Sequence, residues 1–116
     1  MNVLFICQGP AYGDERSYNG LRLAGALAKR DGTDVKVFLI GDGVTCAVAG
    51  QKVPDGYYHL DRMITAAGHH DTEIGCCATC MDARAITDDQ LTAPAHRATL
   101  EDLADWVLWA DKTVTF

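Results

Sequence analysis

The chain has 116 residues, 48% of them hydrophobic, which suits one domain with a full hydrophobic core. Its formal net charge of −6 and pI near 4.9 argue against binding nucleic acid or an anionic membrane, since both select basic surfaces. Met1-Asn2 lacks the basic start of a signal peptide, and the apolar run Val3 to Cys7 is too short to span a bilayer. We therefore expect a cytoplasmic protein without a membrane partner.

The first third of the chain has the pattern of a βαβ unit. Residues 2–7 and 34–40 contain continuous apolar runs, which are typical of strands buried on both faces in a parallel sheet. Between them, the turn-rich segment 9–13 leads into a helix over about residues 15–30, with Asp14 as its candidate N-cap. Segment 9–13 also suggests anion or nucleotide binding, but the chain lacks both G-x-G-x-x-G and a P-loop lysine.

The middle of the chain predicts two helices and a strand. Asp42 is a candidate cap for a short helix that stops at Gly50. A second helix is indicated by apolar residues at i, i+3, i+4 and i+7, ending at Gly68: Leu60, Met63, Ile64 and Ala67. The α/β alternation then requires a third strand over residues 72–76.

The end of the chain predicts one more helix and a closing strand. Thr99 and Asp102 have the spacing of a capping box, and the helix should run to about Ala110. Its buried stripe is predicted to contain Leu100, Leu103, Ala104, Val107 and Leu108. Trp109 falls on the opposite face, which favours either cover by a neighbouring loop or a subunit interface. Residues 113–116 complete an α/β three-layer domain, 1–116, with a mainly parallel sheet flanked by helices.

Three of the five cysteines cluster after the predicted third strand: Cys76, Cys77 and Cys80. In open α/β sheets, ligands and chemistry gather at the carboxyl ends of the strands. If Cys77 begins a helical turn, backbone N–H groups favour its thiolate, which is the nucleophilic form. Cys80 follows one turn later, near enough to resolve a persulfide or disulfide on Cys77, and Arg84 is a candidate source of positive potential.

Other interpretations of this cysteine cluster remain open. The segment Cys-Ala-Thr-Cys lacks the aromatic-Gly-Pro character of thioredoxin-like proteins and follows a third strand rather than the first. A zinc site would need His69 or His70 beside the cysteines, and no second CxxC or spaced histidine pair is present. Cys7 and Cys46 are expected to fill space in the core, and Cys76 either adds a third reactive thiol or faces the core.

Several motifs resemble the DsrE/DsrF-like family, in particular its YchN-like branch. They are Gly9-Pro10-Ala11-Tyr12-Gly13, Leu21-Arg22-Leu23-Ala24, Gly50-Gln51-Lys52, Gly56-Tyr57 and the end of the chain from Ala110. The likeness covers nearly the whole chain. The family's central signature, Cys-x-x-Cys followed by Arg-Gly, falls on Cys77, Cys80 and Arg84-Ala85, with alanine in place of the glycine. If that position requires a positive φ, the alanine costs about 1 kcal/mol.

The resemblance implies a flavodoxin-like fold and a homo-oligomer, typically a trimer or hexamer. In members that transfer sulfur, the persulfide-bearing cysteine lies seven residues before the signature arginine, which is the distance from Cys77 to Arg84. The leading hypothesis is thus a sulfur carrier or sulfurtransferase that uses Cys77, with Cys80 and Arg84 assisting, donor and acceptor proteins as partners, and no cofactor or metal. The alternative is a non-enzymatic oligomer whose cysteines sense redox state or metal.

Overall fold

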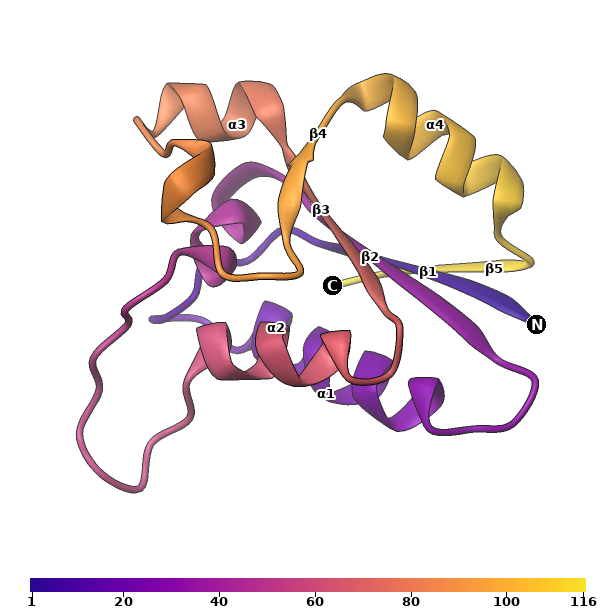
Figure 1. Ribbon diagram of the computed structural model, residues 1–116, viewed down its shortest axis with the longest axis horizontal. Helices are drawn as coiled ribbons and strands as arrows, with labels where there is room; N and C mark the ends of the chain where they lie inside the picture. The colour runs from indigo at the N-terminus through magenta and orange to yellow at the C-terminus, as the bar shows by residue number, and fades with distance from the viewer.

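The computed structural model describes all 116 residues as an α/β domain built on one five-stranded sheet (Figure 1). The strands are β1 (Asn2–Cys7), β2 (Asp34–Leu39), β3 (Glu73–Cys77), β4 (His96–Ala98) and β5 (Lys112–Thr115). The helices are α1 (Arg16–Ala28), α2 (Leu60–Gly68), α3 (Ala78–Ala83) and α4 (Leu100–Trp109), with 3₁₀ turns η1 (Gly41–Ala47) and η2 (Asp88–Gln90).

All neighbouring strands of the sheet are parallel, in the order β4-β3-β2-β1-β5. The central pair, β1 and β2, is in register from Asn2 opposite Asp34 to Cys7 opposite Leu39. Phe5 and Phe38, one on each of these strands, are fully buried. The continuous apolar runs of the sequence are thus explained by strands that are covered on both faces.

Helices cover both faces of the sheet. In Figure 1, α1 and α2 lie together on one side of the sheet, α4 lies on the other side, and α3 lies beyond the carboxyl end of β3. The α/β three-layer architecture predicted from the sequence is therefore confirmed. None of the helices combines the length and apolar character that crossing a membrane requires.

The predicted buried stripe of the last helix is right for Leu103 and wrong for its other four residues, which are exposed. The structure buries Leu103 and Trp106, whereas Leu100 is 69% and Leu108 is 86% exposed. The reason is the size of the indole: a Cβ built on Gly75 of β3 would stand 3.0 Å from the Trp106 ring, so the glycine leaves the space that the tryptophan fills. Phe38 packs edge-on against the same ring, with centroids 5.8 Å apart.

Trp109 lies beside Trp106 and is half-buried. The Lys36 ammonium lies 4.8 Å from the ring centroids of both tryptophans. The contacts of Trp109 in the folded chain therefore include a lysine on β2, in a cation–π arrangement.

Three local features differ from the sequence prediction. The N-cap of α1 is Glu15, while Asp14, one residue earlier, accepts the Arg16 N–H at 2.7 Å. The segment after β2 is a 3₁₀ turn whose N-cap is Ile40, so Asp42 does not cap it. Strand β4 was not predicted because three residues are too few to show a period.

Candidate functional site

Cys77 is the last residue of β3 and the N-cap of α3. It is buried, with 8% of its surface exposed, and Cys80 on the first turn of α3 is half-buried. Gly41 and Asp42 follow the neighbouring strand β2 at the same edge of the sheet. The structure thus places the cysteine pair at the carboxyl ends of the strands, as the sequence predicts.

The surroundings of Cys77 favour its thiolate. The Cys77 Sγ lies 3.4 Å from the Thr79 hydroxyl oxygen. Burial raises the pKa of Cys77, but hydrogen bonds from the side chains and backbone N–H groups of Cys80 and Thr79 outweigh burial and lower this pKa below its usual value. Cys77 is the one cysteine of the five whose pKa is lowered.

The pKa of Cys80 is raised, so Cys80 keeps its proton at neutral pH. The Gly41 N–H donates to the Cys80 Sγ at 3.2 Å. Burial raises the pKa of Cys80, and so do its hydrogen bond to Cys77 and the charge of Cys77, against the opposing effects of Gly41 and Arg84. The two pKa values shift in opposite directions, so Cys77 is the thiol of the pair that loses its proton first.

Arg84 lies against η1 and Cys80. Its Nε and Nη2 donate to Asp42 Oδ1 at 3.1 and 2.8 Å, and its Nη1 donates to the Cys80 carbonyl at 3.0 Å. It makes no hydrogen bond to either sulfur, and its charge lowers the pKa of Cys80 rather than that of Cys77. The structure thus brings together all three predicted site residues, with the arginine nearest to the second cysteine.

Ala85 ends α3 in a left-handed conformation, with φ +56°. The N–H groups of Ala85 and Ile86 donate to the carbonyls of Asp82 and Met81, which is the hydrogen-bond pair of a Schellman motif. The buried side chains of Ile86 and Met81 supply the apolar positions of that motif. The signature position does require a positive φ, so alanine is strained there.

The other three cysteines are buried thiols of the core. Burial is the largest cause that raises the pKa of Cys7 and Cys76 to about 12 and that of Cys46 to about 11. Such groups are protonated at neutral pH and do not act as nucleophiles. Cys76 therefore faces the core instead of adding a third reactive thiol.

The histidines of the metal interpretation lie away from the cysteines. His69 and His70 follow α2 and precede β3, so the length of β3 separates them from Cys77. No group of three or more His, Cys, Asp or Glu side chains is arranged to hold a metal ion.

The whole chain, residues 1–116, matches the model of the DsrE/DsrF-like family. Protein YchN of Escherichia coli K12 is 36% identical over 115 residues, covering 98% of this chain and 97% of that protein. An uncharacterized protein of Methanopyrus kandleri is 33% identical over 114 residues, covering 98% and 92%. The crystal structure of E. coli YchN superimposes with a TM-score of 0.94 at 35% identity, covering 100% of this chain and 99% of that one. The chain belongs to the DsrE/DsrF-like family.

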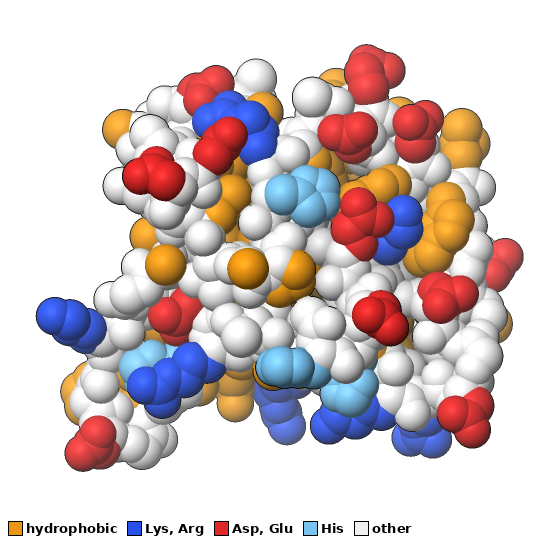
Figure 2. Space-filling view, viewed as in Figure 1, with side chains coloured by type: hydrophobic (Ala, Val, Ile, Leu, Met, Phe, Trp, Pro, Cys, Tyr) orange, Lys and Arg blue, Asp and Glu red, His pale blue; other side chains and the backbone are white.

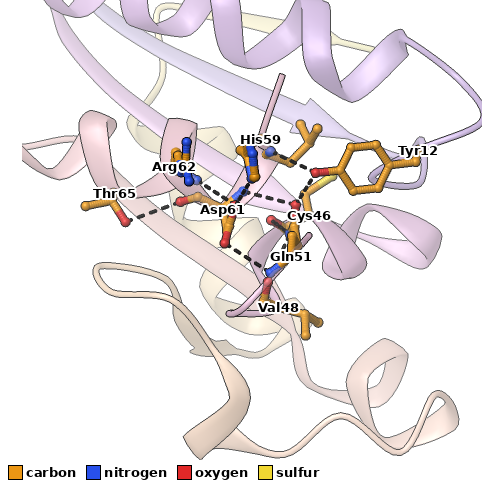
Figure 3. A network of polar contacts seen from close by, with 9 residues as sticks. Tyr12, Cys46, Val48, Gln51, His59, Asp61, Arg62 and Thr65 are labelled. Atoms are coloured by element: carbon orange, nitrogen blue, oxygen red, sulfur yellow. Dashed lines mark hydrogen bonds and ion pairs between the residues drawn. The ribbon is translucent and has the colours of Figure 1, made fainter. Parts of the chain in front are cut away.

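Two motif residues of this DsrE/DsrF-like chain, Tyr12 and Gln51, form a network at the C-terminal end of η1 (Figure 3). Gln51 donates to the carbonyls of Cys46 and Val48 at 3.0 and 2.9 Å, and it accepts the Tyr12 hydroxyl at 2.6 Å. The Asp61 N–H also donates to Gln51, at 3.3 Å, which ties η1 to the start of α2. This network anchors the far end of the turn that presents Gly41 and Asp42 to α3.

Sequence reasoning missed four residues around the cysteine pair of this DsrE/DsrF-like site. Thr79 lies inside the CxxC segment, between the two cysteines. Gly41 and Asp42 directly follow β2. The available signal for these two residues was the rule that the carboxyl ends of adjacent parallel strands meet at one edge of the sheet. Arg97 gave no signal, because it lies on the unpredicted β4. It donates to Asp82, Asp88 and the Ala78 carbonyl and so fastens α3 to β4 and η2.

Proposed function

We propose that this protein is a sulfur carrier or sulfurtransferase in which Cys77 carries the sulfur as a persulfide. The Cys77 thiolate attacks the outer sulfur of a donor persulfide R–S–SH. A bond forms between Cys77 Sγ and that sulfur, the donor S–S bond breaks, and the donor leaves as its thiolate. The sulfur is then passed to an acceptor thiol by the same displacement.

The observation that carries this proposal is the asymmetry of the cysteines. Four thiols have raised pKa values, while Cys77 alone is lowered, at the sheet edge where chemistry gathers. Membership of the DsrE/DsrF-like family supports a role in sulfur relay. The spacing of seven residues between Cys77 and Arg84 is the spacing that the family resemblance associates with the persulfide-bearing cysteine.

The test is intact-protein mass spectrometry after incubation with a persulfide donor. We expect the reduced protein to gain one sulfur, and Cys77→Ser to gain none. Cys76→Ser is the matched control, because it removes the adjacent but buried thiol and should still be loaded. A wild-type protein without a Cys77-dependent sulfur adduct would contradict the proposal.

The metal-sensing alternative receives no support from the arrangement of ligands, since the structure groups no suitable set of side chains. Metal analysis and a thiol titration of the purified protein distinguish the two functions. Stoichiometric zinc that is lost in both Cys77→Ser and Cys80→Ser would favour the sensor.

We further propose that copies of this chain associate through α4. Its exposed residues include Leu100, Val107 and Leu108, and they are accompanied by the acidic residues Glu101 and Asp105. Figure 2 shows acidic side chains gathered over α4. Acidic faces repel one another, so two α4 helices are poor partners.

The surface that best fits α4 is the groove between α1 and α2 of a second copy. This groove is lined by apolar residues such as Leu21, Met63 and Ala67, and by the basic residues Arg22 and Lys29. Leucines and carboxylates on one side thus meet apolar and cationic groups on the other. Such an interface is consistent with the trimers or hexamers that the family resemblance implies.

A further inference from the structure

The position and contacts of Cys80 indicate a role of its own in the chemistry of the site. It lies three residues after the N-cap Cys77 on the first turn of α3, where one helical turn brings the two side chains onto the same face. Its sulfur accepts the Gly41 N–H at 3.2 Å, and each cysteine of the pair is among the causes that shift the pKa of the other. The persulfide-transfer step proposed for Cys77 does not use the hydrogen bond from Gly41.

We propose that Cys80 discharges the Cys77 persulfide within the same chain, so that the sulfur leaves as hydrosulfide. This inference rests on the proposed function, because it requires a persulfide on Cys77. The Cys80 thiolate attacks the Cys77 Sγ, a Cys77–Cys80 disulfide forms, and the bond between Cys77 Sγ and the outer sulfur breaks. That sulfur departs with the electron pair as HS⁻, and the Cys80 proton goes to solvent.

The step balances without an external oxidant. The carried sulfur is reduced to sulfide, and the two cysteine sulfurs are oxidised to the disulfide. A dithiol reductant then returns the pair to its resting state by thiol–disulfide exchange. The protein would thereby divert sulfur to free sulfide whenever no acceptor thiol collects it first.

The electrostatics of the site link the attack by Cys80 to loading of Cys77. In the resting pair, the charge on Cys77 and its hydrogen bond contribute to a raised pKa of Cys80, so Cys80 stays protonated. Once Cys77 carries sulfur, the negative charge moves one atom outward. The Gly41 N–H and the charge of Arg84, which both lower the pKa of Cys80, remain in place.

No other thiol of the chain is available for this step. Cys7, Cys46 and Cys76 are fully buried, and their pKa values are about 12, 11 and 12. A disulfide that forms after loading should therefore join Cys77 only to Cys80.

The experiment compares reduced wild type with Cys80→Ser and Cys80→Ala, each loaded anaerobically with sodium tetrasulfide and freed of excess reagent by gel filtration. Intact mass and released sulfide are then followed without reductant. We expect wild type to lose the added sulfur, release one equivalent of sulfide and form a Cys77–Cys80 disulfide in the peptide map. The persulfide on the Cys80 variants should last at least about ten times longer.

The outcomes separate the two proposals. A wild-type persulfide that lasts as long as that of folded Cys80→Ser or Cys80→Ala overturns the role of Cys80 and leaves the carrier function standing. A disulfide to any other cysteine also overturns it. Failure of wild type and of both Cys80 variants to take up sulfur instead contradicts the carrier function, and the discharge step with it.

Discussion

Arg84 Nη2 lies 2.8 Å from Asp42 Oδ1, so the guanidinium joins the end of α3 to the turn that follows β2. Spacing in the sequence had offered Arg84 as positive potential for Cys77. In the folded chain the arginine instead contacts the Cys80 carbonyl, and its charge lowers the pKa of Cys80.

This contact predicts which cysteine responds to loss of the arginine. In Arg84→Ala we expect the pKa of Cys80 to rise further, while that of Cys77 changes less. NMR titration of ¹³Cβ-labelled cysteines measures both. Arg97→Ala is the control, because Arg97 pairs with Asp82 and Asp88 and is not among the groups that shift either cysteine pKa. A larger response at Cys77 would restore the interpretation based on spacing.

Thr79 predicts a pH dependence of thiol reactivity. The lowered pKa of Cys77 keeps its thiolate present down to a lower pH than in the unfolded chain. Iodoacetamide alkylation of Cys77 should thus rise with pH through a lower midpoint in the folded protein than in the unfolded protein. Thr79→Val removes the hydroxyl, so this midpoint should move upward and alkylation at neutral pH should slow several-fold. Thr113→Val, on the exposed β5, should leave the profile unchanged.

Ala85 predicts a stabilising substitution. Glycine adopts a positive φ without the clash of a Cβ, so Ala85→Gly should stabilise the fold by about 1 kcal/mol and raise Tm by about 4 °C. Ala83→Gly, two residues earlier in the same helix, should instead cost about 0.5–1 kcal/mol. Thermal unfolding followed by circular dichroism compares the two, and equal losses would show that position 85 carries no strain.

At Gly75, unlike Ala85, the predicted substitution lowers the stability of the fold. A Cβ at this position would stand 3.0 Å from both the Ala98 Cβ and the Trp106 ring, so Gly75→Ala should destabilise the fold by about 1–3 kcal/mol. At Gly25 of α1 an added Cβ meets nothing within 4 Å, and Gly25→Ala should stabilise the fold by about 0.5–1 kcal/mol. Urea unfolding gives both values. A neutral Gly75→Ala would mean that Trp106 shifts freely.

Leu108 predicts the effect of charge on self-association. It is 86% exposed on α4, and Leu108→Glu adds another carboxylate to an acidic face that is proposed to bind a second copy. Sedimentation equilibrium should show a lower mass for this variant than for wild type. Leu23→Glu changes an exposed leucine of α1 outside the proposed groove and should keep the wild-type mass. A wild-type protein that sediments as a monomer would contradict the interface.

Local patterns in the sequence determined much of this protein. Apolar runs predicted β1 and β2, the i, i+3, i+4, i+7 spacing predicted α2, and Thr99 with Asp102 predicted the cap of α4; these features depend on near neighbours in the chain. The CxxC segment and its place after β3 were also readable. The positive φ expected at residue 85 follows from the glycine of the family signature.

Only the tertiary structure decided which face of α4 is buried, because two faces of that helix are apolar and the space above Gly75 selects the one that carries Trp106. It also decided the partners of the cysteine pair. Gly41 and Asp42 lie about forty residues from Cys80 and Arg84 in the sequence, and parallel pairing of β2 with β3 brings them to one edge. The asymmetry of the two thiols arises from contacts between distant segments as well as from Thr79, which is why the sequence named Cys77 and Cys80 but not the groups that set them apart.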